Sequence, residues 1–272
     1  MGNRMATNQE ACLGWSLNYT NTFYIARSTD RGMSFYTTNV THLPPSRIPG
    51  SFTRSITAPT NDVFAGGVPS FAVNPVNGYF YLAYYNQPPT GTNRPNIYLI
   101  QLTNGVDWSD PIQVNVEPGG VATDQWQPAI AVKPDGSRLF IAWYDRRDDP
   151  TNHSLIRIYG VFATLPITST SAFATNFAVS TVSFPPVFAG TTMTGTNQFD
   201  PVYPPQLRTD GTNCPTCGGV YSAYTMGDYN RAFSDNNYVY FTCGDNRNTY
   251  TATNGFTRNQ ADVRFIRASW PR

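Results

Sequence analysis

The amino-acid sequence predicts an all-β fold built from repeated, four-stranded antiparallel sheets. Tyrosine and phenylalanine, which favour strands, occur 17 times each among 272 residues. The 22 prolines and 21 glycines are spread along the chain, which is typical of many turns between short strands. In addition, a stretch of sequence recurs with an offset of 59 residues, which indicates a repeated structural unit.

The repeat is clearest between residues 69–86 and 128–145. PSFAVNP at 69–75 matches PAIAVKP at 128–134, and YLAYYN at 81–86 then matches FIAWYD at 140–145 without a gap. Turn-forming residues separate the two strands of each unit. A third strand is expected at 97–101 and 154–159, and a more polar fourth strand at 108–116 and 172–182. Four antiparallel strands in simple meander order form the blade of a β-propeller.

Two further copies are expected at the ends of the sequence. The C-terminal copy has strands at 228–234, 238–243 and 262–267 but lacks a fourth, and the N-terminal copy has a weak or missing first strand before those at 11–16, 23–27 and 35–40. We therefore predict one propeller domain, residues 1–272, with about four blades near 1–45, 68–116, 127–182 and 227–272 and an insertion at 183–226. Its ring is incomplete, part of a larger propeller, or closed by pairing of the termini or by association.

Composition argues against several classes of partner. The net charge is +1, and no basic stripe indicates nucleic acid or an anionic membrane. No apolar run is long enough to span a membrane, and the first nine residues contain no signal peptide. Only 13% of the residues are charged, and a surface rich in Asn, Thr and Ser favours an extracellular or cell-surface location.

Two cysteines lie close together in a loop rich in glycine and proline. A zinc site at Cys214 and Cys217 would need two more ligands, and His42 and His153 are distant in the sequence. A local disulfide is therefore the favoured interpretation, and no motif indicates calcium, another metal or a cofactor. Acceptor sequences for N-glycosylation, in a host that glycosylates, begin at Asn18, Asn39 and Asn152.

One segment, Ser28–Phe35, fits the pattern Ser-x-Asp-x-Gly-x-x-aromatic, known as an Asp-box. We expect the Asp30 carboxylate to accept hydrogen bonds within its own turn, while Gly32 permits a tight reversal. We expect the aromatic ring of Phe35 to anchor the next strand. These are roles in the fold, and none of them is catalytic.

Two further segments, WYDRR at 143–147 and CGDNR at 243–247, look like the Trp-x-Asp-x-Arg segments of bacterial sialidase-like proteins. Together with the Asp-box and the repeat, they cover most of the chain outside the insertion. The sequence therefore resembles the sialidase-like (Asp-box repeat) β-propeller superfamily.

The resemblance implies where a ligand would bind. Sialidases hold their substrate on the rim formed by the loops after the second and fourth strands, opposite the Asp-boxes. Arginines there could grip the carboxylate of an acidic sugar and aromatic rings could cover its faces. Alternatively, each Asp-x-Arg pair could be an ion pair that ties adjacent blades together. The candidates on this rim are Asp124, Trp126, Asp145, Arg147, Asp228, Tyr229, Asp245 and Arg247, and the loop after the strand at 140–145 also places Tyr144 and Arg146 there.

A further candidate is Arg47, in a segment like the Arg-Ile-Pro motif that bears the first arginine of sialidases. In sialidases this motif precedes the first Asp-box, whereas Arg47 follows it, so an ordinary loop arginine is the simpler interpretation.

The catalytic set of sialidases cannot be assigned in this sequence. The family uses three arginines, an aspartate as acid/base and a tyrosine activated by a glutamate. The only glutamates are Glu10 and Glu117, and neither lies in a family context. The sequence therefore favours an extracellular binding or structural module, with glycans or surface proteins as partners. The alternatives are a sialidase-like glycoside hydrolase acting on acidic sugars and a self-assembling surface protein that pairs through open strand edges.

Overall fold

The structure consists of antiparallel sheets. It is a computed structural model that describes residues 3–4, 11–16, 23–28, 30, 32–39, 55–56, 63–64, 69–86, 95–104, 107–120, 122–151, 155–184, 230–251 and 257–271. In this part of the chain the helical elements are two single 3-10 turns, η1 (Pro118–Gly120) and η2 (Thr170–Ala172). The all-β prediction is therefore confirmed.

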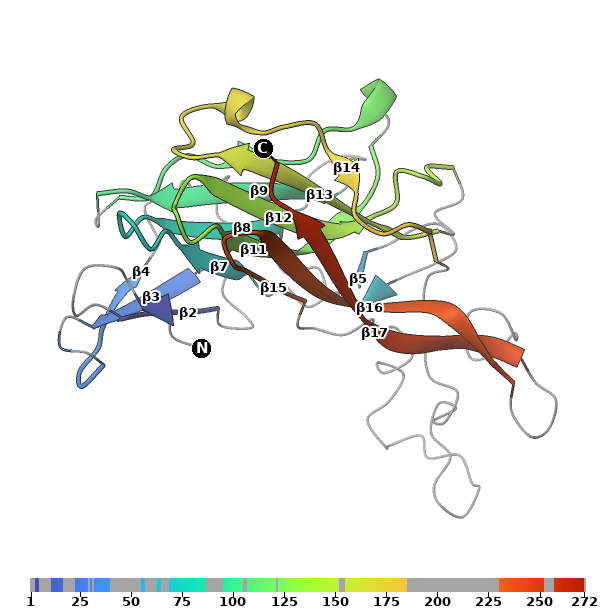
Figure 1. Cartoon of the computed structure of the whole chain (residues 1–272), viewed down its shortest axis with the longest axis horizontal. Helices are drawn as coiled ribbons and strands as arrows, with labels where there is room; N and C mark the ends of the chain where they lie inside the picture. Colours follow the sequence, from blue (N-terminus) through green and yellow to red (C-terminus); the bar gives the residue numbers. More distant parts are fainter. Residues whose placement is uncertain are drawn as a thin grey trace, which may run out of the picture.

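Four sheets follow one another along the chain, and each joins consecutive strands in meander order (Figure 1). Sheet 1 contains β1 (Asn3–Arg4), β2 (Ala11–Ser16), β3 (Phe23–Ser28) and β4 (Tyr36–Asn39). Sheet 2 contains β7 (Ser70–Val73), β8 (Phe80–Asn86), β9 (Asn96–Leu102) and β10 (Ile112–Gln113). Sheet 3 contains β11 (Gln125–Val132), β12 (Arg138–Asp145), β13 (Arg157–Thr164) and β14 (Phe177–Ala178).

Sheet 4 has three strands, β15 (Arg231–Ser234), β16 (Tyr238–Thr251) and β17 (Thr257–Ser269). A separate two-stranded pair consists of β5 (Ser55–Ile56) and β6 (Val63–Phe64). Three four-stranded meanders and a three-stranded one are the blades of a β-propeller, as the repeat predicts.

The repeated sequence gives the same strand pairing in sheets 2 and 3. Phe71 pairs with Leu82, and Ile130 pairs with Ile141, so the 59-residue offset carries one pair onto the other. Because side chains alternate between faces along a strand, equal register puts equivalent residues on equivalent faces of the two sheets.

The first strands of sheets 2, 3 and 4 lie next to one another, with β11 between β7 and β15. The Ile130 amide donates to Ser70 Oγ at 3.2 Å, which joins β11 to β7. Ser234 Oγ donates to the Val132 carbonyl at 2.7 Å, which joins β15 to β11. These strands are therefore the inner strands of the blades, and the remaining strands of each sheet extend outward from them.

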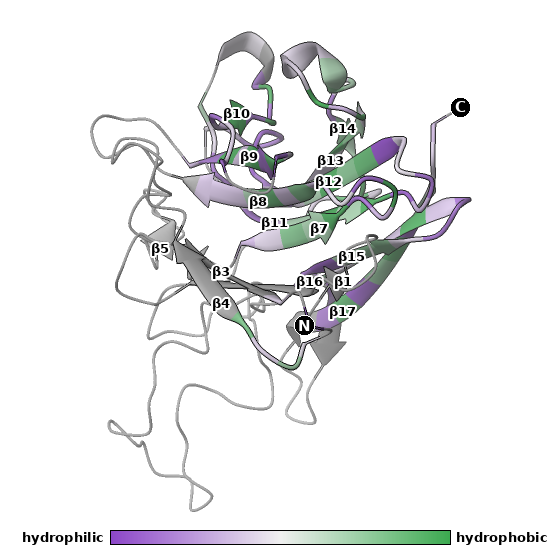
Figure 2. Ribbon diagram, turned by 90° about the vertical axis from the view of Figure 1, so that its left-hand side faces the viewer, coloured by the Kyte–Doolittle hydropathy of each residue, from purple (hydrophilic) through white to green (hydrophobic). Residues whose placement is uncertain are grey.

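Sheet 3 is the centre of the core because both of its faces are covered. All eight residues of β11 are buried, and Phe140, Trp143 and Tyr144 of β12 are at most 1% exposed. Each such side chain stabilises the fold by roughly 1.5–3 kcal/mol relative to an exposed one. Figure 2 shows hydrophobic residues along β7 and β12–β13, where the sheets stack.

A second cluster covers the other face of sheet 2. It contains Phe80, Leu82, Tyr84, Ile100 and Trp108, and the rings of Phe80 and Trp108 meet edge to face at 5.9 Å between centroids. Sheet 2 is thus also apolar on both faces, as expected for a blade between two neighbours.

Several strands differ in length from those predicted. The outer strands β10 and β14 have two residues each, and the isolated bridges Leu102–Trp108 and Ile156–Phe184 continue the pairing of these outer segments with the neighbouring strands. β13 runs from Arg157 to Thr164, later than the predicted 154–159. β16 and β17 extend well beyond the predicted strands, and their hairpin projects from the body (Figure 1). Their Asn- and Thr-rich ends lack the apolar alternation that reveals a strand.

The structure also bears on the ends of the predicted ring. A short first strand, β1, pairs with β2 through Asn3 and Arg4, although two residues are too few to show a pattern in the sequence. Among the described residues, β1 pairs with β2 alone and β17 with β16 alone. Pairing of these terminal strands with each other is therefore not observed.

The predicted Asp-box forms a turn held by its own side chains. Asp30 Oδ1 accepts hydrogen bonds from the Ser34 amide at 2.9 Å and from Ser28 Oγ at 2.7 Å, and the Gly32 amide donates to Ser28 Oγ at 2.7 Å. Hydrogen bonds from Ser34 and then Ser28 lower the pKa of Asp30 to about 2. Gly32 has a φ of +88°, which a side chain would disfavour. Phe35 directly precedes β4 and is 51% exposed, so its ring is only half buried, and its anchoring role stays a prediction.

The hairpin turns of sheets 2 and 3 touch each other. Asn74 Nδ2 donates to the Gly136 carbonyl at 3.0 Å, and Gly136 has a φ of +73°. A Cβ atom on Gly136 would lie 2.6 Å from Asn74 Oδ1 and 2.9 Å from a methyl of Val76. A side chain at this position would therefore push the two blades apart.

Gly136→Ala should destabilise the protein more than Gly119→Ala. Gly119 has nearly the same φ, +70°, but open space around its missing side chain. Both substitutions carry the left-handed backbone penalty of about 1–2 kcal/mol, and only Gly136→Ala adds an overpacking term of about 1–3 kcal/mol. Urea unfolding of the two variants measures the difference, and equal stabilities would contradict the packing of these turns.

Candidate functional site

One end of sheet 3 gathers several residues predicted from the sequence. β11 begins and β12 ends at this edge, so Gln125 pairs with Asp145 and Trp126 with Tyr144. The Arg146 amide donates to the Asp124 carbonyl at 3.2 Å, which fixes the loop after β12 against the start of β11. We call this group the rim cluster; it consists of Asp124, Trp126, Tyr144, Asp145, Arg146 and Arg147.

A buried ion pair lies inside the rim cluster. Arg146 Nη1 is 3.1 Å from Asp124 Oδ2, and the two side chains are 0% and 1% exposed. The Arg146 guanidinium also lies 5.5 Å from the ring centre of Trp126. Because the charges are shielded from water, removing either partner would take away a compensating charge from a buried ion. The sequence places Arg146 on this rim but does not predict its pairing with Asp124, since nothing in the 22-residue spacing indicates this contact.

A second buried carboxylate, Asp145, is held by its own loop. Asp145 Oδ2 accepts hydrogen bonds from Trp143 Nε1 at 2.8 Å and from Arg147 Nε and Nη2 at 2.9 and 2.6 Å. Asp145 Oδ1 accepts from the Arg147 amide at 2.8 Å. Donors therefore surround the carboxylate, and its side chain is 0% exposed.

The Asp145–Arg147 ion pair does not itself tie adjacent blades together, since both residues belong to one loop of sheet 3. The connection to sheet 2 runs through Asn176, whose Oδ1 accepts from Arg147 Nη2 at 3.5 Å and from the Val116 amide at 2.7 Å. Tyr159 of sheet 3 packs on the other side, with its ring centre 4.2 Å from the Arg147 guanidinium. Arg147 is thus a structural hub with only 7% of its side chain exposed.

The same arrangement recurs in sheet 4 with one change. Asp245 Oδ2 accepts from Arg247 Nε at 2.6 Å, and Oδ1 accepts from the Arg247 amide at 3.1 Å. Cys243 stands where Trp143 stands in sheet 3, and Arg264 Nε, 3.4 Å from Asp245 Oδ1, supplies a further donor. The side chains of Arg247 and Arg264 are 22% and 32% exposed, so these guanidinium groups reach the surface.

Aromatic rings connect the rim cluster to sheet 4. The rings of Trp126 and Tyr144 stack at 5.4 Å between centroids, and the Tyr144 hydroxyl donates to the Gly244 carbonyl at 2.7 Å. Asn230 Nδ2 donates to the carbonyl of Gln127, a non-glycine residue with a φ of +48° at a bulge in β11. Burial raises the pKa of Tyr144 well above its ordinary value, so this hydroxyl remains a neutral donor.

Glu117 supports the loop that leads into β11. Its Oε1 accepts hydrogen bonds from the Thr123 amide at 2.9 Å and from Gln125 Nε2 at 3.2 Å. Gln125 Oε1 in turn accepts from Asn115 Nδ2 at 3.1 Å. This glutamate therefore holds the backbone next to Asp124, and its bonds are those of a structural residue.

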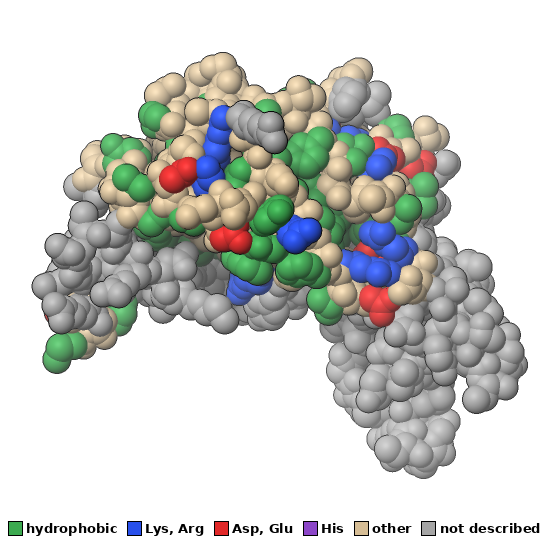
Figure 3. Space-filling model, viewed as in Figure 1, with side chains coloured by type: hydrophobic (Ala, Val, Ile, Leu, Met, Phe, Trp, Pro, Cys, Tyr) green, Lys and Arg blue, Asp and Glu red, His purple; other side chains and the backbone are tan. Residues whose placement is uncertain are grey.

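An additional charged group next to the rim cluster was not predicted from the sequence. Asp148 accepts hydrogen bonds from the Tyr159 hydroxyl at 2.6 Å and from Arg157 Nη1 at 3.0 Å. Burial, followed by the hydrogen bond to Asp148, raises the pKa of Tyr159 to about 12. Figure 3 shows that positively and negatively charged side chains on the face in view occur together in small groups, which is consistent with ion pairing at the surface.

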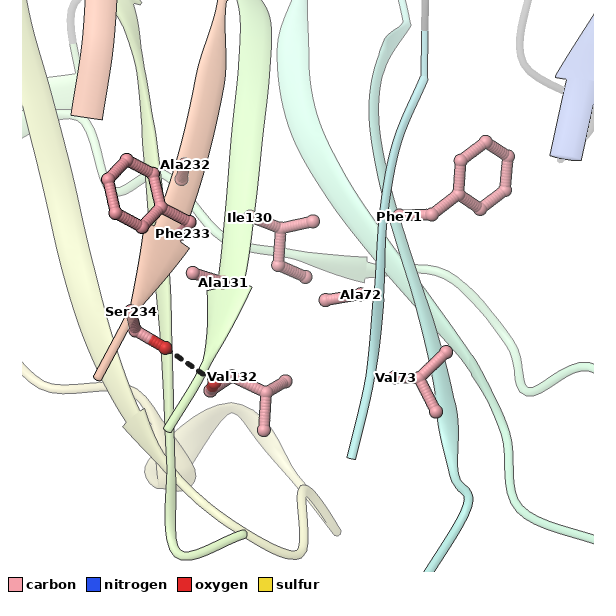
Figure 4. Close-up of a pocket in the computed structure, with 9 residues that line it drawn as sticks. All are labelled: Phe71, Ala72, Val73, Ile130, Ala131, Val132, Ala232, Phe233 and Ser234. Carbon is pink, nitrogen blue, oxygen red and sulfur yellow. Dashed lines mark hydrogen bonds between the residues drawn. The ribbon is translucent and has the colours of Figure 1, made fainter. Parts of the chain in front are cut away.

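A space of about 270 Å³ runs along the inner strands β7, β11 and β15. In Figure 4, Ala72 and Ala131 lie between neighbouring strands, whereas the rings of Phe71 and Phe233 point away from β11. The single hydroxyl of the lining, that of Ser234, already donates to Val132. This space is lined by no charged side chain, so the rim is the better candidate site for an acidic ligand. Its lining consists of Phe71, Ala72, Val73, Ile130, Ala131, Val132, Ala232, Phe233 and Ser234.

The remaining predicted positions divide into two groups. Asn39 is the last residue of β4. Arg47, Asp228, Tyr229, Cys214, Cys217, Asn18 and Asn152 lie outside the described residues. Within the described ranges, no group of three or more His, Cys, Asp or Glu residues could hold a metal ion, and no helix is long and apolar enough to cross a membrane.

Comparison with known proteins gives matches among solved structures. No protein-family model and no curated protein matches the sequence. An α-L-arabinanase of Penicillium chrysogenum, solved with arabinobiose, is 11% identical with a TM-score of 0.46, over 93% of this chain and 58% of that one. A Hadza microbial sialidase is 13% identical with a TM-score of 0.44, over 94% and 41%.

An α-L-arabinofuranosidase of Fusarium graminearum, solved with arabinobiose, is 11% identical with a TM-score of 0.41, over 90% and 54% of the two chains. This chain thus spans 41–58% of the length of these three proteins. At such identities the similarity concerns the fold alone.

Asp124→Ala should destabilise the protein by about 3–5 kcal/mol, because it removes the carboxylate that pairs with the buried Arg146 guanidinium. Asp135→Ala is the matched control, since it removes an aspartate whose side chain is 45% exposed and pairs with Lys133. The control should cost about 1 kcal/mol or less. Chemical denaturation measures both values, and similar costs would show that the Asp124–Arg146 pair is open to water.

Cys243 should resist alkylation while the protein is folded. Burial, followed by the charge of Asp245, raises the pKa of its thiol to about 12. The thiolate is therefore scarce at pH 8, and the stabilising effect of the neutral thiol is lost only as the pH rises from the unfolded value of about 8.5 towards the folded one. Mass spectrometry after iodoacetamide treatment should find the peptide containing Cys243 modified in denaturant only; rapid labelling without denaturant would contradict its burial.

Proposed function

We propose that this chain is an extracellular propeller module that binds acidic carbohydrates at its rim and does not hydrolyse them. The observation that carries the proposal is the pairing of the rim carboxylates. Asp124, Asp145 and Asp245 are 0–1% exposed, and each is in contact with an arginine.

Glycoside hydrolysis needs carboxyl groups in a different state. One must be protonated and reach the glycosidic oxygen, while a second group must reach the sugar as nucleophile or base. A buried carboxylate covered by a guanidinium group does not reach a sugar. The described rim therefore supports a binding role over a catalytic one.

The exposed arginines of sheet 4 supply the binding groups. Nε and Nη2 of Arg247 contact Asp245, which leaves the N–H groups of Nη1 for another acceptor. Arg264 approaches the same carboxylate from β17 and is 32% exposed. Two adjacent guanidinium groups at the surface can hold the carboxylate of a sialic or uronic acid through charge-assisted hydrogen bonds.

Isothermal titration with 3′-sialyllactose tests this proposal, with lactose as the neutral control ligand. Arg247→Ala should weaken the binding of 3′-sialyllactose about tenfold or more, because a hydrogen bond to a charged group contributes about 1.5–3 kcal/mol. Arg138→Ala, at the far end of β12 where the arginine bonds Thr164, should leave binding unchanged. Equal binding of lactose, or an equal effect of the two substitutions, would overturn the proposal.

A fluorogenic sialoside tests the alternative of a hydrolase. The wild-type protein should release no more fluorophore than a heat-denatured sample. Turnover that disappears in Arg147→Ala, while circular dichroism shows that the variant is folded, would establish an enzyme and refute the non-catalytic assignment.

A further inference from the structure

The outer face of sheet 4 exposes large apolar side chains. Phe233, Phe265 and Val263 are 53%, 60% and 84% exposed. The rings of Phe233 and Tyr240 stack at 4.7 Å between centroids, and those of Tyr240 and Phe265 at 5.6 Å. We call this surface the outer aromatic face; it consists of Arg231, Phe233, Tyr238, Tyr240, Thr242, Val263, Phe265, Arg267 and Ser269.

The opposite face of sheet 4 is buried in the core. Val239 and Phe241 alternate with the exposed residues of β16, are 1% exposed, and belong to the core shared with sheet 3. In the same way, sheet 3 covers one face of sheet 2. The outer aromatic face is thus the counterpart of surfaces that are buried in the two preceding sheets.

The contact between successive blades does not fit this face unchanged. Phe233 pairs with Tyr240 in sheet 4 in the same way that Ala131 pairs with Phe140 in sheet 3. Phe233 therefore occupies the position in its sheet that Ala131 occupies in sheet 3. The small side chain of Ala131 lets β15 lie beside β11, whereas the ring of Phe233 projects from the face (Figure 4). Gly244 takes the place of Tyr144, whose hydroxyl bonds the next sheet. The face therefore suits a partner other than a further blade of the same design.

The residues of the outer aromatic face form rows across the three strands, and each row is complementary to a copy of itself turned end for end. One row runs Arg231, Thr242, Phe265 across β15, β16 and β17, and the next runs Phe233, Tyr240, Arg267. Each row thus has an arginine at one end and a phenylalanine at the other, in opposite order to its neighbour. A guanidinium group over an aromatic ring is attractive.

We propose that the outer aromatic face binds a second copy of this chain through a two-fold axis parallel to β16. This axis places β15 of each copy over β17 of the other. Arg231 then faces Phe265 of the second copy, and Phe233 faces its Arg267, so that four arginine–aromatic contacts form by symmetry. Such an interface is isologous and closes on itself.

The size of the face sets the expected strength. Three strands about 4.8 Å apart and a few residues long cover far less than the roughly 800 Å² per partner of stable complexes. The aromatic and arginine content is typical of the energetically dominant part of an interface. The dimer is therefore expected to form reversibly, at micromolar concentrations or above.

Sedimentation velocity of the full chain, from about 1 µM to about 1 mM, tests the proposal. The mass of the wild-type protein should rise from one chain towards two across this range. Phe265→Ser, which removes the ring opposite Arg231, should remain monomeric throughout. Val116→Ser is the matched control, since Val116 is 67% exposed in the segment after β10, away from sheet 4, and this variant should dimerise like the wild type.

Arg267→Glu provides a second variant if Phe265→Ser does not fold as judged by circular dichroism. It removes the charge opposite Phe233 and should likewise abolish the concentration-dependent mass. A wild-type monomer at all concentrations overturns the proposal. A dimer that persists in the variants that fold, or that is lost in Val116→Ser, overturns it as well.

Discussion

The burial of sheet 3 on both faces is the constraint on which the rest of the structure depends. Its inner strand has no exposed residue, so each neighbouring sheet must bring a matching surface to it. The inner strands approach closely because alanines stand between them, and serine hydroxyls satisfy backbone groups across the gaps. The position of the rim cluster follows from this packing, since it lies where the central sheet begins and its second strand ends.

Charge pairing explains how so many ionisable groups fit at the edge of an apolar core. Asp124 and Asp145 are buried, and burial of an ionised carboxylate is costly unless donors surround it. Their guanidinium partners supply several donors each and retain their charge at every relevant pH. The pairs orient the loops rigidly, and the arginines of sheet 4 that reach solvent are held on this support.

The sequence predicts those parts of the fold that repeat. The 59-residue offset and the apolar runs of β8, β11 and β12, separated by turn-forming residues, indicate the strands and the position of the rim. It does not predict the contact of Arg146 with Asp124, because a loop contact across a sheet edge leaves no periodic signal. Nor does it predict the long arm of β16 and β17, whose polar ends have no buried face, or the partial exposure of Phe35.

The two Asp-x-Arg loops meet the same requirement with different residues. In the loop of sheet 3 the indole of Trp143 donates to the carboxylate; in the loop of sheet 4 Cys243 holds that position, and Arg264 from the adjacent strand donates instead. The two loops thus share a buried anion that needs donors, whereas the residues that supply the donors differ. Because a guanidinium group brings a charge and an indole does not, the loop of sheet 4 carries a second cation and presents to solvent a surface that the loop of sheet 3 lacks.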